Sequence, residues 1–199
     1  LQQWLGVDTA GHVQAFSGKV DLGQGISHAL RLIVAQELRL DPSHIDMVPA
    51  STHTSPDEAV TSGSLSVQHS GAALRCAAAH WREICRLQMA LRCGVDVSAV
   101  RCANGQFWVE AHAHTASYAE LSSAQMWQST IDTTHVQSPH ATQDQDTWQT
   151  QPTARRPDVA SKVFGEFEYI HDRVLPNMCH GMVFRPGTLT AEVIASEMQ

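Results

Sequence analysis

Two loops have the residue types and spacing best suited to binding a large anionic ligand. Residues 18–25 (GKVDLGQG) lead into one predicted helix, and residues 61–66 (TSGSLS) come just before another. The first turn of a helix presents unpaired backbone N–H groups and a partial positive charge, which attract phosphates and other anions. If the two loops converge in space, they would suit a polar cofactor that contains a pyrophosphate.

The candidate binding positions in these loops offer either close backbone approach or a polar side chain. Gly23 and Gly25 would let the backbone come near a ligand, and Gln24 between them can donate and accept hydrogen bonds. The second loop adds Thr61, Ser62, Gly63, Ser64 and Ser66. The residues alone leave another interpretation open, in which the glycines form ordinary turns and the hydroxyls cap helices.

Other catalytic and metal-binding patterns are missing or weak. The segment GQGISH lacks the last glycine of the dinucleotide fingerprint, and there is no GxxxxGK[ST], GxSxG or HExxH motif. His112 and His114 would share one face of a strand, but with no third ligand nearby we expect them to be exposed. Asp57 and Glu58 could act as a general base, although adjacent loop carboxylates are more often solvated or capping. We therefore assign no catalytic and no metal-ligating residue.

The composition is that of an acidic globular chain. The 199 residues are 43% hydrophobic and 17% charged, with a formal net charge of −7. Nucleic-acid binding needs clustered Lys and Arg, and Arg155 and Arg156 form the only adjacent basic pair. No apolar run approaches the roughly 18 residues that a membrane-spanning helix requires. We expect neither a nucleic-acid partner nor a membrane span.

The cysteines indicate a reducing compartment. Their number is odd and no two form a CxxC pair, which argues against a zinc ribbon or a cysteine-ligated iron–sulfur cluster in this chain. We expect reduced, partly buried thiols. The N-terminus shows no basic segment followed by an apolar one, so the expected location is cytoplasmic.

Hydrophobic periodicity predicts the elements that would hold the two loops. A hairpin within residues 3–20 leads into the first loop, and a helix begins near Ile26 and stops at Asp41-Pro42. A short strand is predicted at Ile45–Val48, followed by a long loop of small residues.

A second helix is predicted from about residue 67 to about residue 92, with Gly94 at its end. Its predicted apolar stripe consists of Leu74, Ala77, Ala78, Trp81, Ile84, Cys85 and Leu91. A second hairpin turns at Asn104-Gly105, and a helical turn is predicted at residues 118–121. This order of elements favours an α+β fold, in which a mixed sheet packs against helices.

The two loop segments carry a family resemblance. GKVDLGQG (residues 18–25), the amphipathic helix after it and TSPDEAVTSGSLSVQHSGAALRCAA (residues 54–78) resemble the molybdenum-binding large subunit of the xanthine oxidase and aldehyde oxidase family. The isoquinoline 1-oxidoreductase and nicotinate dehydrogenase type is the most similar. RPDVASKVFGEFEYIHDRVLPNMCHGMVFRP (residues 156–186) is similar to the segment that enters the hammerhead domain of that subunit.

The resemblance implies a molybdopterin cofactor, including its cytosine dinucleotide form. Gly23, Gln24 and Gly25 match a family loop that contacts the pterin. A second family loop, which lines the pterin and its phosphates, is matched by Thr61, Ser62, Gly63, Ser64, Leu65 and Ser66. Family members hydroxylate N-heteroaromatics or aldehydes with oxygen from water, and electrons leave through a separate small iron–sulfur subunit.

The resemblance also implies a fragment. The family subunit is several times longer, and its glutamate base has no matching motif here, so the chain alone is expected to be inactive. The implied partners are the remainder of the molybdenum subunit and the iron–sulfur subunit. The expected parts are a cofactor-binding portion at residues 1–121, a polar linker or crossing segment at 122–156, and the start of a hammerhead-like domain at 157–199.

Two other functions stay open at this stage. The chain could be a catalytically silent interaction module, which includes self-association into a homo-oligomer. It could also be a phosphate- or nucleotide-binding domain unrelated to molybdenum.

Overall fold

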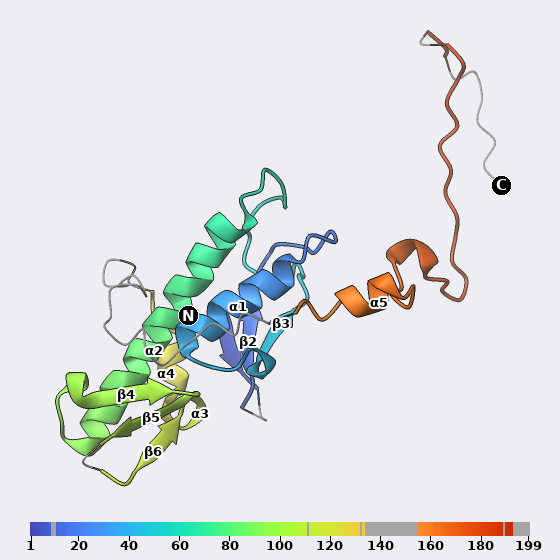
Figure 1. Ribbon diagram of the computed structural model, residues 1–199. Coiled ribbons are helices and arrows are strands. Elements are labelled where there is room, and N and C mark those ends of the chain that lie inside the picture. The colour runs from blue at the N-terminus through green and yellow to red at the C-terminus, as the bar shows by residue number, and fades with distance from the viewer. Residues whose placement is uncertain (9–10, 111, 132, 134–154, 189, 193–199) are drawn as a thin grey trace. The chain divides into compact units, whose positions relative to one another are not determined.

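The first candidate loop follows the central strand of a small mixed sheet. β1 (Leu5–Val7) pairs antiparallel with β2 (Val13–Phe16), and β2 pairs in parallel with β3 (Ile45–Val48). Val13 and Ala15 of β2 are buried, as expected for a strand with one covered face. The computed structural model (Figure 1) describes residues 1–8, 11–110, 112–131, 133, 155–188 and 190–192.

Helix α1 (Ile26–Leu38) connects the parallel strands β2 and β3 and contacts β3. It ends because Arg39 adopts a left-handed conformation with φ 53°, from which its N–H donates to the carbonyls of Ala35 and Gln36. Asp41 instead caps the 3-10 turn η1 (Pro42–His44), accepting from the backbone N–H of Ser43 at 2.9 Å.

Helix α2 (Ala72–Cys93) lies beside α1 and extends past the first sheet (Figure 1). It follows a π-helical turn, η2 (Val67–Gly71), and ends at Gly94 with φ 66°. The predicted stripe is correct apart from its last member, because Leu91 is 75% exposed. The helix continues its buried face through Met89 and Ala90 instead.

The second predicted hairpin is present and belongs to a three-stranded antiparallel sheet of β4 (Val100–Ala103), β5 (Gln106–Val109) and β6 (Thr115–Ser117). Asn104 and Gly105 both have positive φ, which the tight turn requires. Strand β6 was not predicted, because its three residues give no alternating pattern to detect. The sheet contacts α2 through β4 and β5.

The chain after β6 first adds to the core. α3 (Tyr118–Leu121) and α4 (Ala124–Trp127) follow in sequence, and Trp127 packs onto the hydrophobic core. The N-terminal ammonium of Leu1 donates to the carbonyl of Ser129 at 2.8 Å. Part of the segment predicted as a linker, residues 122–131, is therefore integrated into the first unit, while Trp148 lies outside the described residues.

A second unit begins at Asp158. Its described part contains α5 (Val159–Val163) and the 3-10 turn η6 (Ile170–Asp172). Most of its large apolar side chains are exposed. None of the helices described in either unit has the length and apolar character needed to cross a membrane.

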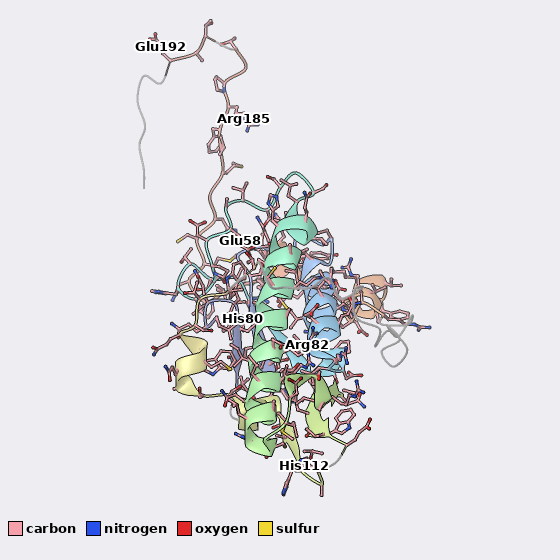
Figure 2. The ribbon with its side chains drawn as sticks, turned by 90° about the vertical axis from the view of Figure 1, so that its left-hand side faces the viewer. Glu58, His80, Arg82, His112, Arg185 and Glu192 are labelled. Atoms are coloured by element: carbon pink, nitrogen blue, oxygen red, sulfur yellow. The ribbon has the colours of Figure 1, made fainter. Side chains whose placement is uncertain are left out.

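A buried charge locks the two helices of the first unit together. Glu37 of α1 has a fully buried side chain, whose Oε1 lies 2.8 Å from Arg82 Nη1 and whose Oε2 lies 3.5 Å from Arg75 Nη1. Arg82 also donates to the backbone carbonyl of Glu37, and Figure 2 shows it on the side of α2 that faces α1. A buried carboxylate of this kind requires its partners.

Replacing Glu37 with alanine should destabilise the fold by about 3 kcal/mol, since two partly buried arginines would lose their counter-charge. The measurement is urea unfolding followed by circular dichroism. Glu83→Ala is the matched control, because Glu83 is half exposed and only 3.2 Å from Arg86 on the same helix. The Glu83→Ala change should lower the free energy of unfolding by less than about 1 kcal/mol. Equal losses for the two variants would contradict the assigned role of Glu37.

The thiols should react in the order of their burial. Burial raises the pKa of Cys85 to about 12 and also raises the pKa of Cys102, whereas Cys179 is exposed. Because the thiolate is the reactive form, iodoacetamide at neutral to mildly alkaline pH should label Cys179 first and spare Cys85 and Cys102 until urea is added. Peptide mass spectrometry measures this, and equal labelling of Cys85 and Cys179 in the folded chain would refute it.

The same burial sets a pH dependence. The pKa of Cys85 is near 9.0 in the unfolded chain and about 12 in the folded one, so between these values the unfolded state has released a proton that the folded state retains. Its contribution to stability is therefore complete below pH 9 and declines as the pH rises towards 12.

Candidate functional site

The two candidate loops meet beyond the C-terminal end of β2. The backbone N–H of Val20 donates to Thr61 Oγ1 at 3.0 Å, across a separation of 41 residues. Gly18 passes so close to the second segment that an added Cβ would collide with the carbonyl oxygen of Pro56. The convergence on which the cofactor interpretation depends is present in the structure.

Lys19 and Glu58 tie the bases of the loops together. The buried Lys19 donates from Nζ to the carbonyls of Glu58 at 2.6 Å and Val60 at 3.1 Å. Glu58 Oε2 accepts from Ser17 Oγ and from the N–H of Gly18, both at 2.7 Å. Figure 2 shows Glu58 towards the N-terminal end of α2, with His112 near the other end. Glu58 thus caps a turn, in agreement with the capping interpretation of this carboxylate.

The glycine-rich loop is held by its own polar side chains. Gln24 Nε2 donates to the carbonyl of Val20 at 3.1 Å, and its Oε1 accepts from the N–H of Leu22 at 2.5 Å. Asp21 Oδ1 accepts from the N–H groups of Gly23 at 3.0 Å and Gly25 at 3.2 Å. Gln24 therefore links the loop to Val20, the residue that contacts Thr61. Its amide shapes the loop in addition to being exposed at the surface.

The second loop contains a strained turn at its tip. Gly63 and Ser64 have φ 67° and 58°, so both central residues of the turn are in the left-handed region, as in a type I′ turn. This conformation is unfavourable for serine, and such strain concentrates at binding sites. Ser62 and Ser64 are exposed, and their hydroxyls make no hydrogen bond within the part of the chain that the structure describes. They are available to an external ligand.

Arg156 adds positive charge next to the first loop. Its Nη2 donates to the carbonyl of Gly23 at 3.2 Å, and its guanidinium covers the position that a Cβ on Gly25 would occupy. Gly25 is the N-cap of α1, with φ 79°. A guanidinium beside the positive end of a helix dipole is an arrangement that an anion would stabilise.

Large apolar side chains also extend from the two loops and their flanks into solvent. The exposed residues are Val20, Leu22, Val60, Leu65 and Val67. Leu22 and Val60 are 72% and 74% exposed. Clustered exposure of this kind marks surfaces that another structure covers.

The loops could be identified from the sequence, but the residues that join them could not. Lys19, Glu58 and Arg156 were not predicted as joining residues, because each acts on a residue far away in sequence. Asp21, shortly before the GQG triplet, was detectable as a side chain able to accept from the amides of its own loop. His112 and His114 are exposed, as expected.

The chain is similar to known proteins over most of its length. Residues 2–167 match the model of the family described as "Molybdopterin cofactor-binding domain". The chain is 36% identical over 187 residues to one of the subunits of nicotinate dehydrogenase from Pseudomonas putida, covering 94% of this chain and 15% of that protein. It is 32% identical over 118 residues to the gamma subunit of the 6-hydroxypseudooxynicotine dehydrogenase complex of Paenarthrobacter nicotinovorans, covering 59% of this chain and 15% of that one.

A solved structure shows the same local fold. The CO dehydrogenase from Oligotropha carboxidovorans matches with a TM-score of 0.52 and 25% identity, over 59% of this chain and 15% of that chain. The present chain thus spans about 15% of the length of the relatives it matches. The α+β fold expected from the sequence is confirmed. The family match over most of the chain, together with the relative at 36% identity, shows that this chain belongs to the molybdopterin cofactor-binding domain family.

Proposed function

We propose that the two joined loops form one wall of the molybdopterin site in the large subunit of a molybdenum hydroxylase. The observation that carries this proposal is the hydrogen bond between Val20 and Thr61, which joins the two loops that resemble cofactor-contacting segments of the family. The proposed contact residues are Gly23, Gln24, Gly25, Thr61, Ser62, Gly63, Ser64, Leu65 and Ser66.

The residues present fit such a group. The hydroxyls of Ser62 and Ser64 are exposed and can donate to phosphate or pterin oxygens. Gly23 has open space where a Cβ would point, so a planar ring could approach the backbone there. Arg156 supplies a cation at the edge of the same loop. Within this chain, the role of these groups is to bind and orient the cofactor.

When bound, molybdopterin would supply the oxidative chemistry that introduces oxygen from water into an N-heteroaromatic or an aldehyde. An N-heteroaromatic is the favoured substrate class, because the relative at 36% identity is named for nicotinate. The cytosine dinucleotide form is included in this proposal because the family resemblance implies it.

The proposed partners are the remainder of the molybdenum subunit and a small iron–sulfur subunit. The exposed apolar side chains on the two loops support the first, because the matched relatives contain several times more chain than is present here. The printed name of one relative describes a complex with several subunits. All five cysteines are free thiols, which supports a cytoplasmic location.

The same apolar surface favours one second candidate, a catalytically silent module that self-associates. Light scattering after size-exclusion chromatography separates the two: a stable homo-oligomer that persists when the rest of the subunit is co-expressed favours the module. A nucleotide-binding domain unrelated to molybdenum would instead change its tryptophan fluorescence on titration with ATP.

Gln24→Ala should lower the cofactor content, because the loop would lose both hydrogen bonds that fix it to Val20 and Leu22. The measured quantities are the molybdenum content and the pterin fluorescence per chain in the co-expressed complex, and we expect both to decrease several-fold. Gln88→Ala is the matched control on the exposed face of α2 and should retain full content. Equal cofactor content in the two variants, with the fold intact, would contradict the proposal. Arg82 is unsuitable as a control, because it pairs with Glu37.

The chain alone should show no turnover. Catalysis requires positioned acid–base groups and a closed cofactor envelope. The two loops supply neither, because the Glu58 carboxylate is already hydrogen-bonded to Ser17 and Gly18. The assay is hydroxylation of nicotinate and of an aldehyde by the purified 199-residue chain, with the co-expressed complex as the positive control. Turnover by the chain alone would overturn this expectation.

A further inference from the structure

A cluster of side chains that could bind a metal ion lies at the end of the first sheet opposite the two candidate loops. We propose that Asp8, His12 and Asp46 bind a divalent transition-metal ion of the Zn²⁺, Co²⁺ or Ni²⁺ type. One ligand atom from each residue lies within 4.8 Å of the other two. This site goes beyond the proposed cofactor function and does not depend on it.

One of the ligand separations already matches that of a bound ion. His12 Nδ1 lies 3.3 Å from Asp46 Oδ2. Tetrahedral ligands about 2.1 Å from zinc are themselves about 3.4 Å apart. The side chains of His12 and Asp46 are 45% and 54% exposed, which leaves them room to rotate towards a shared ion.

Three adjacent strands hold the cluster in place. Asp8 and His12 close the β1–β2 hairpin: the N–H of Asp8 donates to the carbonyl of His12 at 3.0 Å, and the N–H of His12 donates to Asp8 Oδ1 at 2.9 Å. Asp46 lies opposite Gln14 in the parallel β2–β3 pair. The backbone positions are therefore fixed by sheet hydrogen bonds before any ion arrives, which lowers the entropy cost of binding.

His44 lies beside the cluster, outside its group of ligand atoms within 4.8 Å, and could rotate to become a fourth ligand. Its ring is edge-on to that of His12, with the centroids 5.9 Å apart. It precedes β3 in the turn η1 and is exposed. Two imidazoles with two carboxylates are a donor set that suits zinc, cobalt or nickel, whereas magnesium and calcium prefer oxygen alone.

The cluster also borders a cavity of about 630 Å³, whose lining includes Asp8, His44 and Tyr118. A water molecule or a small exogenous ligand could reach a bound ion from this side. Because β2 and β3 are parallel, the cluster at their N-terminal ends is separated from the cofactor loops by the length of the strands.

The test is titration of the 199-residue chain with Co²⁺, followed by visible absorption, and then displacement by Zn²⁺. We expect the visible spectrum of Co²⁺ bound at low coordination number. His12→Ala and Asp46→Asn should each weaken Co²⁺ binding by about tenfold or more, since even the loss of a residue that only supports a metal ligand has an effect of this size. His112→Ala is the matched control, because it removes an exposed histidine near the second sheet and should leave the affinity unchanged.

Asp46→Asn decides the outcome if His12→Ala fails to fold, since Asp46 is exposed and the change keeps its size. Far-UV circular dichroism reports folding for each variant. The proposal is overturned if folded Asp46→Asn binds Zn²⁺ as tightly as the unaltered chain, if His112→Ala weakens binding to the same degree, or if Mg²⁺ displaces Co²⁺ at equal concentration.

Discussion

The ammonium group of Lys19 is the constraint on which the two candidate loops depend. A buried cation needs hydrogen-bond acceptors, and Lys19 finds them in the carbonyls of Glu58 and Val60, on the second segment. In the opposite direction, the Glu58 carboxylate on the second segment accepts hydrogen bonds from Ser17 and Gly18 on the first. Separating the two segments would break all four of these hydrogen bonds together. The distance between the loops is thus determined at their base, which leaves their tips free to meet a ligand.

The groups exposed at the loop tips depend on which side chains accept hydrogen bonds from the backbone amides of each loop. In the first loop, the side chains of Asp21 and Gln24 accept hydrogen bonds from the backbone N–H groups of Leu22, Gly23 and Gly25. The conformation of this loop is therefore stabilised by contacts within the loop. In the second loop the turn at Gly63 and Ser64 directs two serine hydroxyls outwards. Polar groups and exposed leucine and valine side chains share this surface. This combination is what the proposed function requires, with polar groups for a cofactor and apolar groups for covering protein.

The sequence predicted those features that are local. The start of the helix near Ile26 and the strand at Ile45–Val48 were predicted from the apolar pattern, and the turn at Asn104-Gly105 from its turn chemistry, because each signal lies within a few residues. The loops themselves stood out by composition. The parallel register of β2 and β3, the burial of Glu37 between two arginines and the position of Arg156 were not predictable, since each depends on residues brought together only by the fold. Leu91 was misassigned because an apolar residue type does not by itself show burial, and the buried face of α2 continues through Met89 and Ala90 instead.

The separation of 41 residues between Val20 and Thr61 has a consequence for how the chain acquires its structure. The β1–β2 hairpin is a local contact that can form as soon as it is synthesised, whereas the junction of the loops must wait for α1, β3 and the segment after them. During this interval Lys19 and the apolar side chains of the first loop are all hydrated. We therefore expect the junction of the two loops to be among the last features of this sheet to form, after the strands and the helix beneath it.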